Sequence, residues 1–335
     1  MEQEIKVSVC CLTYNHEKYI EEAIKGFIMQ KTDFKFEVII HDDASTDNTA
    51  SIIKAYEEKY PEIIKGIYQP KNLYSQKIGI TNNFIVPRVS GKYVAMCEGD
   101  DYWTDPYKLQ KQYDALEQNK DCYFCVHKTE EIKADGETTG IIFPKAQLDS
   151  GKIGSRDFIR MCRAYSFHTS SYMFRVDEWK KYVLDPPDFK KLSDVGDEPY
   201  MLYFGQLGSV YYISDSMSAY RRGVEGSWSA RNSQSVDPAK LVKHPAAMVN
   251  SLKAFDEYTG GEYRDLMIPR IASMMVQVGL LTKSSKNMLS KENRVYFNSI
   301  SKKKKISVIA AAMLPGLALK MYIKRLRRLY GKKGY

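Results

Sequence analysis

The sequence has few cysteines, and they form no pattern that would bind a metal. Six occur in 335 residues, at positions 10, 11, 97, 122, 125 and 162, and most lie within apolar runs. Cys122 and Cys125 have the CxxC spacing, but the second CxxC or paired histidines of a zinc site are absent. We therefore expect six reduced thiols in the core of a cytosolic protein.

Glycine-rich phosphate loops and a secretory signal are also missing. The dinucleotide pattern GxGxxG, the P-loop and the GxSxG elbow do not occur, which argues against oxidoreductases, P-loop enzymes and serine hydrolases. The N-terminus is acidic, and the apolar run at 7–12 is too short for a signal peptide. With 44% apolar residues, the composition suits a globular α/β protein.

Acidic residues are absent from the last segment, 302–335, which contains 11 Lys and Arg. The whole chain has a formal net charge of +9, so removing the +11 of this segment leaves −2 for residues 1–301. The basic character therefore belongs to a tail. Because the nearly neutral body has no basic stripe interleaved with aromatic residues, nucleic acid is not an expected partner.

Strand and helix patterns alternate through the first 130 residues. Short, nearly continuous apolar runs are typical of buried parallel strands, whereas apolar residues at i, i+3, i+4 and i+7 are typical of helices. Strands are expected at 5–13, 36–40, 63–68, 93–97 and 122–127, and helices at 20–28, 77–89 and 105–119. A further helix is expected after the cap-type residues 45–47, with its inner face at Ile52, Ile53, Tyr56 and Tyr60. This order predicts a Rossmann-like, mostly parallel sheet with helices on both faces and ligands beyond the carboxyl ends of the strands.

The rest of the chain is less regular. Helices are expected at 155–162, 177–182 and 197–206, and strands at 170–174, 210–214 and 217–221. Residues 237–281 have a helical pattern with a break at Gly260-Gly261. We therefore expect a first domain at 1–235, a helical extension at 236–301 and a basic tail at 302–335.

Carboxylates cluster where the strand at 93–97 ends. Glu98, Asp100 and Asp101 follow it directly. Like charges this close repel, and a hard divalent cation, Mg²⁺ or Mn²⁺, would relieve the repulsion and bridge the acids to a phosphate. The alternative is a solvated acidic turn, with Asp105-Pro106 as the N-cap and first residue of the next helix. The polar loops at 13–16 and 41–45 should share the same sheet edge.

Three motifs, in this order, resemble family-2 glycosyltransferases. They are Thr13-Tyr14-Asn15 after the first strand, Asp42-Asp43-Ala44-Ser45-Thr46-Asp47 after the second, and Gly91-Lys92-Tyr93 leading to Glu98-Gly99-Asp100-Asp101. The resemblance is strong over residues 5–115 and readable to about residue 230. It implies a GT-A fold and the transfer of a sugar from a nucleotide-sugar, most often a UDP-sugar.

The resemblance also implies roles in binding the nucleotide. Thr13, Tyr14 and Asn15 would line its pocket. Asp43 would hydrogen-bond the base, and Asp42 would support that loop or contact the ribose.

In the DxD-like element, Asp101, supported by Asp100, would hold Mn²⁺ or Mg²⁺ on the donor diphosphate. Glu98 would face the ribose or sugar. The family usually has Asp in its place, which leaves direct metal ligation by Glu98 open.

An inverting transfer needs a general base for the acceptor hydroxyl. The segment Gly196-Asp197-Glu198-Pro199 resembles the place where the family puts it, so Asp197 is the expected base and Glu198 the second candidate. A helix N-terminus would keep the carboxylate ionised. The alternative is that Asp197 only caps the helix.

The remaining candidates come from the weaker part of the resemblance. Arg221 and Arg222 would carry charge toward the donor diphosphate, or lie on a solvated strand edge. His168, Trp103 and Trp228 would lie on the acceptor side, although His168 is equally a core histidine and Trp103 equally a packing residue.

The tail predicts the location of the protein. Its apolar run, 306–319, contains Pro315 and is too short to span a bilayer, while 320–329 alternates basic and apolar residues as an interfacial helix does. We expect a cytoplasmic enzyme on the inner face of the cell membrane, acting on a glycan or lipid-linked acceptor in surface polysaccharide synthesis. The tail docking on the body or on a second copy of the chain stays open, as do a sugar nucleotidyltransferase and a non-catalytic nucleotide-sugar-binding protein.

Overall fold

The computed structural model describes residues 4–162, 166–225 and 237–331. The chain divides into two compact units, one made of 1–186 and 201–224 and the other of 187–200 and 225–335. Residues 187–200, which the sequence pattern places in the first domain, belong to the second unit. Each unit is described separately.

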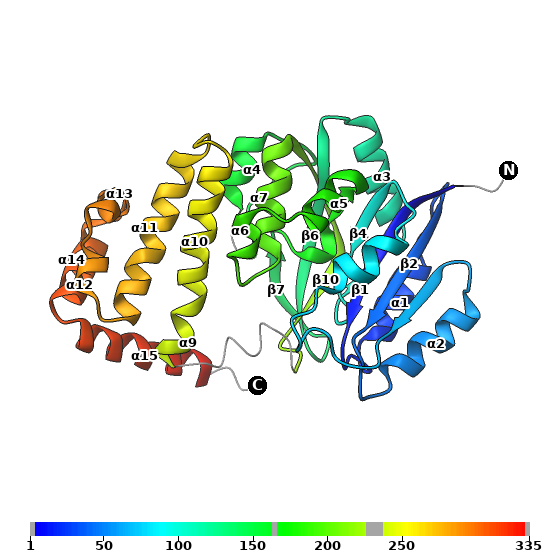
Figure 1. The fold of residues 1–335 in the computed structure, drawn as a ribbon, viewed down its shortest axis with the longest axis horizontal. Coiled ribbons are helices and arrows are strands. Elements are labelled where there is room, and N and C mark those ends of the chain that lie inside the picture. Colours follow the sequence, from blue (N-terminus) through cyan, green and yellow to red (C-terminus); the bar gives the residue numbers. More distant parts are fainter. Residues whose placement is uncertain (1–3, 163–165, 226–236, 332–335) are drawn as a thin grey trace. The chain divides into compact units, whose positions relative to one another are not determined.

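The first unit is built on one sheet (Figure 1), with the strand order β3-β2-β1-β4-β9-β6-β10-β5, while β7 pairs with β6 and β8 with β10. The strands are β1 Ile5–Thr13, β2 Lys35–Asp42, β3 Ile64–Tyr68, β4 Tyr93–Met96, β5 Tyr102–Trp103, β6 Cys122–Lys133, β7 Thr138–Phe143, β8 Gly151–Ile153, β9 Met173–Arg175 and β10 Ser209–Arg222. The pairs among β3, β2, β1 and β4 are parallel, as is β6 with β10. The expected α/β architecture is confirmed.

Buried side chains on both faces hold the parallel strands in place. Val9 of β1 pairs with Val38 of β2 and Ala95 of β4, and all three are fully buried. Strands that are apolar on both faces need cover on both, which explains the continuous apolar runs in the sequence. All six cysteines are buried, as expected of thiols in the core.

The helices of the first unit largely follow the apolar periodicity. They are α1 Ile20–Ile28, α2 Thr49–Lys59, α3 Lys108–Gln118, α4 Ser155–Met161, α5 Val176–Leu184 and most of α7 Asp197–Leu207. In α1, Ile20, Ala23, Ile24 and Phe27 are fully buried at the spacing of one helix face. The expected amphipathic helix at 20–28 is therefore confirmed.

Two expected helices differ from the structure. Residues 77–89 contain only a π-helical turn, Thr81–Ile85, and a 3₁₀ turn, Val86–Arg88, because Pro87 cannot donate a backbone hydrogen bond. The helix expected from Asp105 begins at Lys108. Asp105 accepts a hydrogen bond from the backbone of Tyr107, so Asp105-Pro106 is a turn before the helix rather than its cap.

The strands after residue 165 also differ from the expected bounds. The strand expected at 170–174 begins at Met173, after a 3₁₀ turn at Thr169–Ser171. The two strands expected at 210–214 and 217–221 are one strand, β10, whose pairing register with β6 shifts between Ile213 and Ser218. That irregularity breaks the apolar alternation, so the sequence pattern suggested two strands.

Within the described residues, the second unit is helical. Besides the start of α7, it contains α6 Asp188–Lys191, α9 Pro238–Leu241, α10 Lys243–Tyr258, α11 Arg264–Leu281, α12 Ser285–Met288, α13 Arg294–Ser299, α14 Lys302–Met313 and α15 Pro315–Gly331. The expected break falls between α10 and α11, where Gly260 and Gly261 have φ of 60° and 83°. Among the described helices none alone is long and apolar enough to cross a membrane, although α14 and Pro315–Leu326 pass that test as a pair bent by 119°.

Candidate active site

The loops after β1 and β2 interlock through side-chain to backbone hydrogen bonds. The Asn15 backbone N–H donates to Ser45 Oγ at 2.8 Å, and Asn15 Oδ1 accepts from the Thr46 backbone N–H at 2.8 Å. Asn15 has φ 55° and Ala44 has φ 62°, so both lie in the left-handed region. Cross-loop bonds hold this strained backbone at the sheet edge where ligands of such folds bind.

Asp42 and Asp43 are buried and bind the protein's own loops. Asp42 accepts hydrogen bonds from the backbone and hydroxyl of Ser45. The two carboxylate oxygens of Asp43 accept from the backbone N–H groups of Leu73, at 2.8 Å, and Tyr74, at 3.0 Å. Asp43 therefore orders the loop that follows β3, and its contact with a nucleobase stays a prediction.

Thr13, at the end of β1, lies close to Gly99 in the loop after β4. Its buried Oγ1 has no hydrogen-bond partner among the described residues, and a Cβ placed on Gly99 would lie 2.6 Å from that oxygen. The neighbouring Tyr14 is 42% exposed. The absence of a side chain at Gly99 is what lets the two loops approach.

Gly99→Ala is therefore expected to destabilise the protein by about 1–3 kcal/mol, because the added methyl overlaps Thr13 and one of the two loops must move. Chemical denaturation measures the change. Gly154→Ala is the matched control, since a Cβ at Gly154 meets no heavy atom within 4 Å. Equal stability of the two variants would show that the loops yield freely.

Glu98, Asp100 and Asp101 form the acidic cluster expected from the sequence. Each offers a carboxylate oxygen, and these atoms all lie within 4.8 Å of one another. Glu98 is exposed, whereas Asp100 and Asp101 are 8% and 2% exposed. Burial raises the pKa of both aspartates, and the charges of Asp100 and Glu98 raise that of Asp101 further.

A divalent cation fits this cluster. Asp101 Oδ2 is buried and has no hydrogen-bond partner among the described residues, so one oxygen is left for a ligand. Three carboxylates held this close are a hard-oxygen donor set suited to Mg²⁺ or Mn²⁺. A cation bound here would also offset the burial of the two aspartates.

Arg221 of β10 donates hydrogen bonds to the loop that contains Asp100 and Asp101. Its backbone N–H donates to Asp101 Oδ1 at 2.8 Å, and its Nε donates to the Asp100 carbonyl at 3.1 Å. The guanidinium also pairs with Glu22 and lies 4.8 Å from the ring centre of Tyr19. Because Arg221 is only 4% exposed, the alternative of a solvated strand edge is wrong for it.

Arg222 points to a different partner. Its guanidinium forms an ion pair with Glu131 of β6 at 3.1 Å, and Glu131 is 2% exposed. Both arginines therefore bind protein carboxylates in this structure, and their contact with a donor diphosphate stays a prediction.

Two histidines lie beside the acidic cluster. His168 Nδ1 is 3.6 Å from Asp101 Oδ2, and its ring stacks on Tyr220. Burial lowers the pKa of His168 to about 3, so its ring is neutral at pH 7. His16 Nε2 lies 3.9 Å from Asp100 Oδ2. Sequence reasoning placed His16 only within a polar loop; its position directly after Thr13-Tyr14-Asn15 was the available signal.

The tryptophans expected on the acceptor side give one correction. Trp103 is 1% exposed, its ring packs on Phe27, and its Nε1 donates to the Ser170 carbonyl at 3.0 Å. A sugar cannot stack on a ring that is enclosed by the core, so Trp103 is a packing residue. Trp228 lies outside the described residues.

Asp197 and Glu198 belong to the second unit, at the N-terminus of α7. Burial raises the pKa of Asp197, because the loss of hydration outweighs the backbone hydrogen bonds at the start of the helix. Glu198 is buried in an ion pair with Arg270. That pair makes Glu198 the poorer base, while the role of Asp197 stays a prediction.

Several known proteins resemble this chain in sequence. Residues 8–172 match the family model of glycosyl transferase family 2. Rv1520 of Mycobacterium tuberculosis is 33% identical over 230 residues, which are 66% of this chain and 60% of that relative. The chain thus matches about 60% of the length of that relative. TuaG of Bacillus subtilis, named as a teichuronic acid biosynthesis glycosyltransferase, is 34% identical over 118 residues, 35% of this chain and 44% of that one.

The fold has a counterpart among solved structures. S. aureus TarS, solved with UDP-GlcNAc, aligns with a TM-score of 0.59 and 16% identity, covering 99% of this chain and 93% of that one. This likeness confirms the expected GT-A type of fold. Residues 8–172 therefore form a glycosyl transferase family 2 domain, and the relatives and the fold agree with that assignment.

Proposed function

We propose that the protein transfers a sugar from a nucleotide-sugar, with a UDP-sugar as the favoured donor, to a hydroxyl group of a glycan or lipid-linked acceptor in surface polysaccharide synthesis. The observation that carries this proposal is the cluster of Glu98, Asp100 and Asp101 at the end of β4, next to the loops after β1 and β2. That arrangement can hold the diphosphate of a donor at the acidic cluster and its nucleoside at the neighbouring loops.

Different residues of the first unit would bind the diphosphate and the nucleoside of the donor. Asp101, with Asp100, would hold Mn²⁺ or Mg²⁺, and the bound cation would neutralise the charge that grows on the diphosphate leaving group. The Arg221 backbone N–H occupies Asp101 Oδ1, which leaves Oδ2 for a ligand. Hydrogen bonds within the protein already hold the loops of Asn15 and Asp43, which would reduce the ordering needed when the nucleotide binds.

Release of the leaving group distinguishes transfer from its main rival. We expect the purified protein, given a panel of UDP- and GDP-sugars, to release UDP only when Mn²⁺ or Mg²⁺ is present. Release of pyrophosphate would identify a sugar nucleotidyltransferase instead. If UDP-sugars bind and neither UDP nor pyrophosphate is released, the protein is a non-catalytic nucleotide-sugar-binding protein.

Asp197 is proposed as the general base of an inverting transfer, and Asp197→Asn is expected to lower kcat by about 10²–10⁴-fold. Because burial raises the pKa of Asp197, the acidic limb of kcat/KM should lie above the ordinary aspartate value of 3.8. Below that pKa the base is protonated and transfer stops. A pH–rate profile measures the limb, which Asp197→Asn should abolish.

The control for this variant is three residues upstream. Asp194 pairs with His244 at 2.9 Å, so Asp194→Asn removes a nearby carboxylate without touching the proposed base. It should keep the limb. Full transfer by Asp197→Asn would remove the catalytic assignment.

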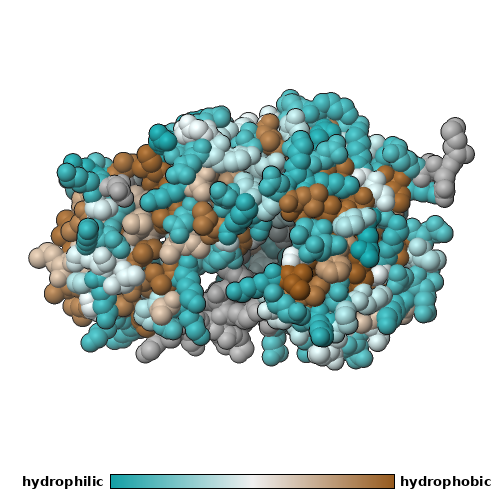
Figure 2. Space-filling model, viewed as in Figure 1, coloured by the Kyte–Doolittle hydropathy of each residue, from teal (hydrophilic) through white to brown (hydrophobic). Residues whose placement is uncertain are grey.

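We further propose that the basic tail binds an anionic lipid surface and places the enzyme on the cytoplasmic face of the cell membrane. Apolar side chains exposed on α14, α15 and the turn between them are Ile306, Ile309, Met313, Leu314, Leu317 and Met321, and Met313 is 75% exposed. Apolar residues are visible at this part of the surface in Figure 2. Exposed Lys320, Lys324 and Arg325 supply positive charge beside them.

Vesicle sedimentation tests the tail. The full chain should pellet with phosphatidylglycerol vesicles and not with phosphatidylcholine vesicles, and the triple variant Ile306→Ser, Met313→Ser, Met321→Ser should stay in solution. If instead the variant binds vesicles like the wild type, the apolar surface has another use. A change from dimer to monomer in that variant would identify a second copy of the chain as its occupant.

A further inference from the structure

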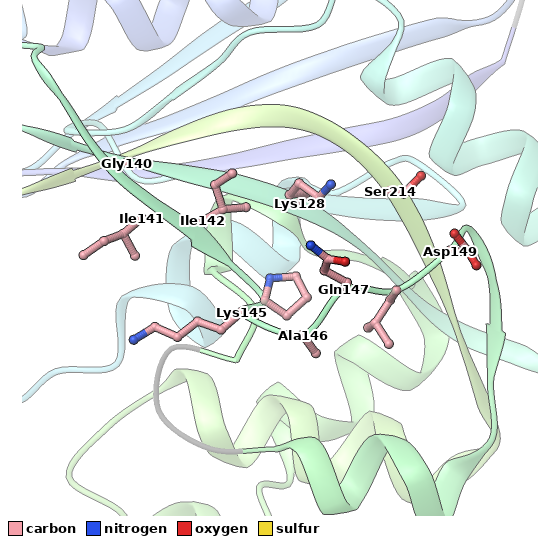
Figure 3. Close-up of a pocket in the computed structure, with 11 residues that line it drawn as sticks. Lys128, Gly140, Ile141, Ile142, Lys145, Ala146, Gln147, Asp149 and Ser214 are labelled. Carbon is pink, nitrogen blue, oxygen red and sulfur yellow. The ribbon is translucent and has the colours of Figure 1, made fainter.

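A pocket of about 850 Å³ opens in the first unit, and none of the candidate site residues lines it. Small-molecule sites usually measure roughly 300–1,000 Å³. Its walls come from the end of β7, the segment 144–149, Lys128 of β6 and Ser214 of β10 (Figure 3). The pocket is far larger than a single water or phosphate ion needs, so it suits a ligand of several units.

The charged groups in this pocket are mostly positive. Lys128 and Lys145 both line it, and neither forms an ion pair among the described residues. Asp149 is the single carboxylate of the lining, which leaves a net positive charge. An ammonium group without a partner is a strong donor to a carboxylate or phosphate.

The apolar part of the lining is aliphatic. Ile141, Ile142, Pro144 and Leu148 contribute it, and no aromatic ring lines the pocket. A nucleobase in a protein site is usually held by stacking on aromatic rings, which are missing here. Aliphatic walls, the Gln147 amide and two ammonium groups instead match a flexible chain that carries negative charges.

The strand pairing connects this pocket to the acidic cluster. Lys128 pairs with Ser216 of β10, and Ile132, four residues later on β6, pairs with Arg221. The separation along β6 is about 13 Å at the rise of a strand. Arg221 in turn holds Asp101. An extended chain could therefore occupy the pocket while its end lies near the donor.

We propose that this pocket binds an acidic glycan, a sugar or polyol chain carrying carboxylates or phosphates, as the acceptor of the transfer reaction. The role of this glycan as acceptor rests on the proposed function, whereas its binding to the pocket does not. Lys128 and Lys145 are its specificity-determining residues.

Binding is tested with three probes of equal length: an oligogalacturonate, a glycerol phosphate oligomer and a neutral malto-oligosaccharide. Isothermal titration of the full chain should show binding of at least one acidic probe and weaker binding of the neutral one. The double variant Lys128→Gln, Lys145→Gln should lose roughly tenfold or more in affinity for that acidic probe. Whichever acidic probe binds more tightly shows whether the pocket prefers carboxylates or phosphates.

Lys133→Gln is the matched control, since Lys133 ends the same strand and pairs with Glu137 outside the pocket. It should bind the acidic probe like the wild type. Equal binding of neutral and acidic probes, or an unchanged affinity in the double variant, would overturn the proposal. UDP release without acceptor should persist in the double variant. If the wild type releases no UDP, the proposed function fails, and the titrations still decide on the pocket.

Discussion

Asp101→Asn is expected to lower kcat by about a hundred- to a thousandfold, the largest effect on activity in the acidic cluster, because it removes the buried oxygen left for a cation. The substitution keeps the shape of the side chain. Its amide oxygen can still accept the hydrogen bond that Arg221 now donates to Asp101 Oδ1. The loop should therefore hold its position while it loses one charge.

Stability measurements separate loss of the cation from loss of the fold. Asp101 is buried beside Asp100 and Glu98, so removing its charge relieves repulsion. Without metal, the Tm of Asp101→Asn should equal or exceed that of the wild type. Mn²⁺ with UDP should raise the Tm of the wild type and leave that of the variant unchanged. Transfer within a few-fold of wild type would remove Asp101 from the site.

Glu98→Gln is the companion variant, since it changes the exposed member of the cluster and leaves both buried aspartates intact. A small loss of activity with a normal response to Mn²⁺ would place Glu98 at the ribose or sugar. A loss as large as that of Asp101→Asn would make it a metal ligand.

Local patterns were sufficient to predict the part of the site that comes from short segments. The continuous apolar run of β1 set its bounds at Ile5–Thr13, as the structure has them. The carboxylates that follow β4 could be recognised because they directly succeed a buried strand. Parallel pairing of β1 with β2 and β4 then brings the three loops to one edge.

Contacts between distant segments could not be predicted. Arg221 holds Asp101 across 120 residues of sequence, and no periodicity marks such a partner. His168 and Trp103 are polar or amphipathic residues whose burial depends on which elements cover them. Pro87 lies within the helix expected at 77–89, and its missing N–H is the signal in the sequence against that helix.

Lys108 is a buried ammonium group that the helical pattern did not reveal. It is fully buried in α3, its Nζ donates to Gln112 Oε1 at 2.7 Å, and the Trp103 ring centre is 3.9 Å away. No carboxylate pairs with it among the described residues. Burial lowers the pKa of Lys108 from 10.5 to about 7.

This lowered pKa costs stability in a defined pH range. Between pH 7 and 10.5 the unfolded chain binds a proton at Lys108 that the folded chain binds poorly, so stability attributable to this group rises with pH. At about pH 7 the penalty is on the order of 4 kcal/mol, and it vanishes above pH 10.5. The nearby Trp103 ring offsets part of the charge burial.

Lys108→Met is therefore expected to stabilise the protein by roughly 1–3 kcal/mol at pH 7, after about 1–3 kcal/mol is subtracted for leaving Gln112 Oε1 without its donor. At pH 10 the charge penalty is almost gone while the lost hydrogen bond remains, so the variant should be the less stable protein. Urea denaturation at the two pH values measures this change of sign.

Lys111→Met is the control on the same helix, because its effect on stability should stay nearly constant from pH 7 to 10 and diminish only above pH 10.5. Lys111 pairs with Asp105 and Asp215. Burial lowers the pKa of Lys111, but the hydrogen bonds to these two carboxylates and their charges together outweigh burial, so the pKa is raised. Its contribution to stability is present at pH 7 and is lost as the pH rises through the raised pKa. A Lys108→Met difference that stays constant from pH 7 to 10 would mean that Lys108 keeps its proton in the folded protein, with the Trp103 ring and Gln112 sufficient to hold the charge.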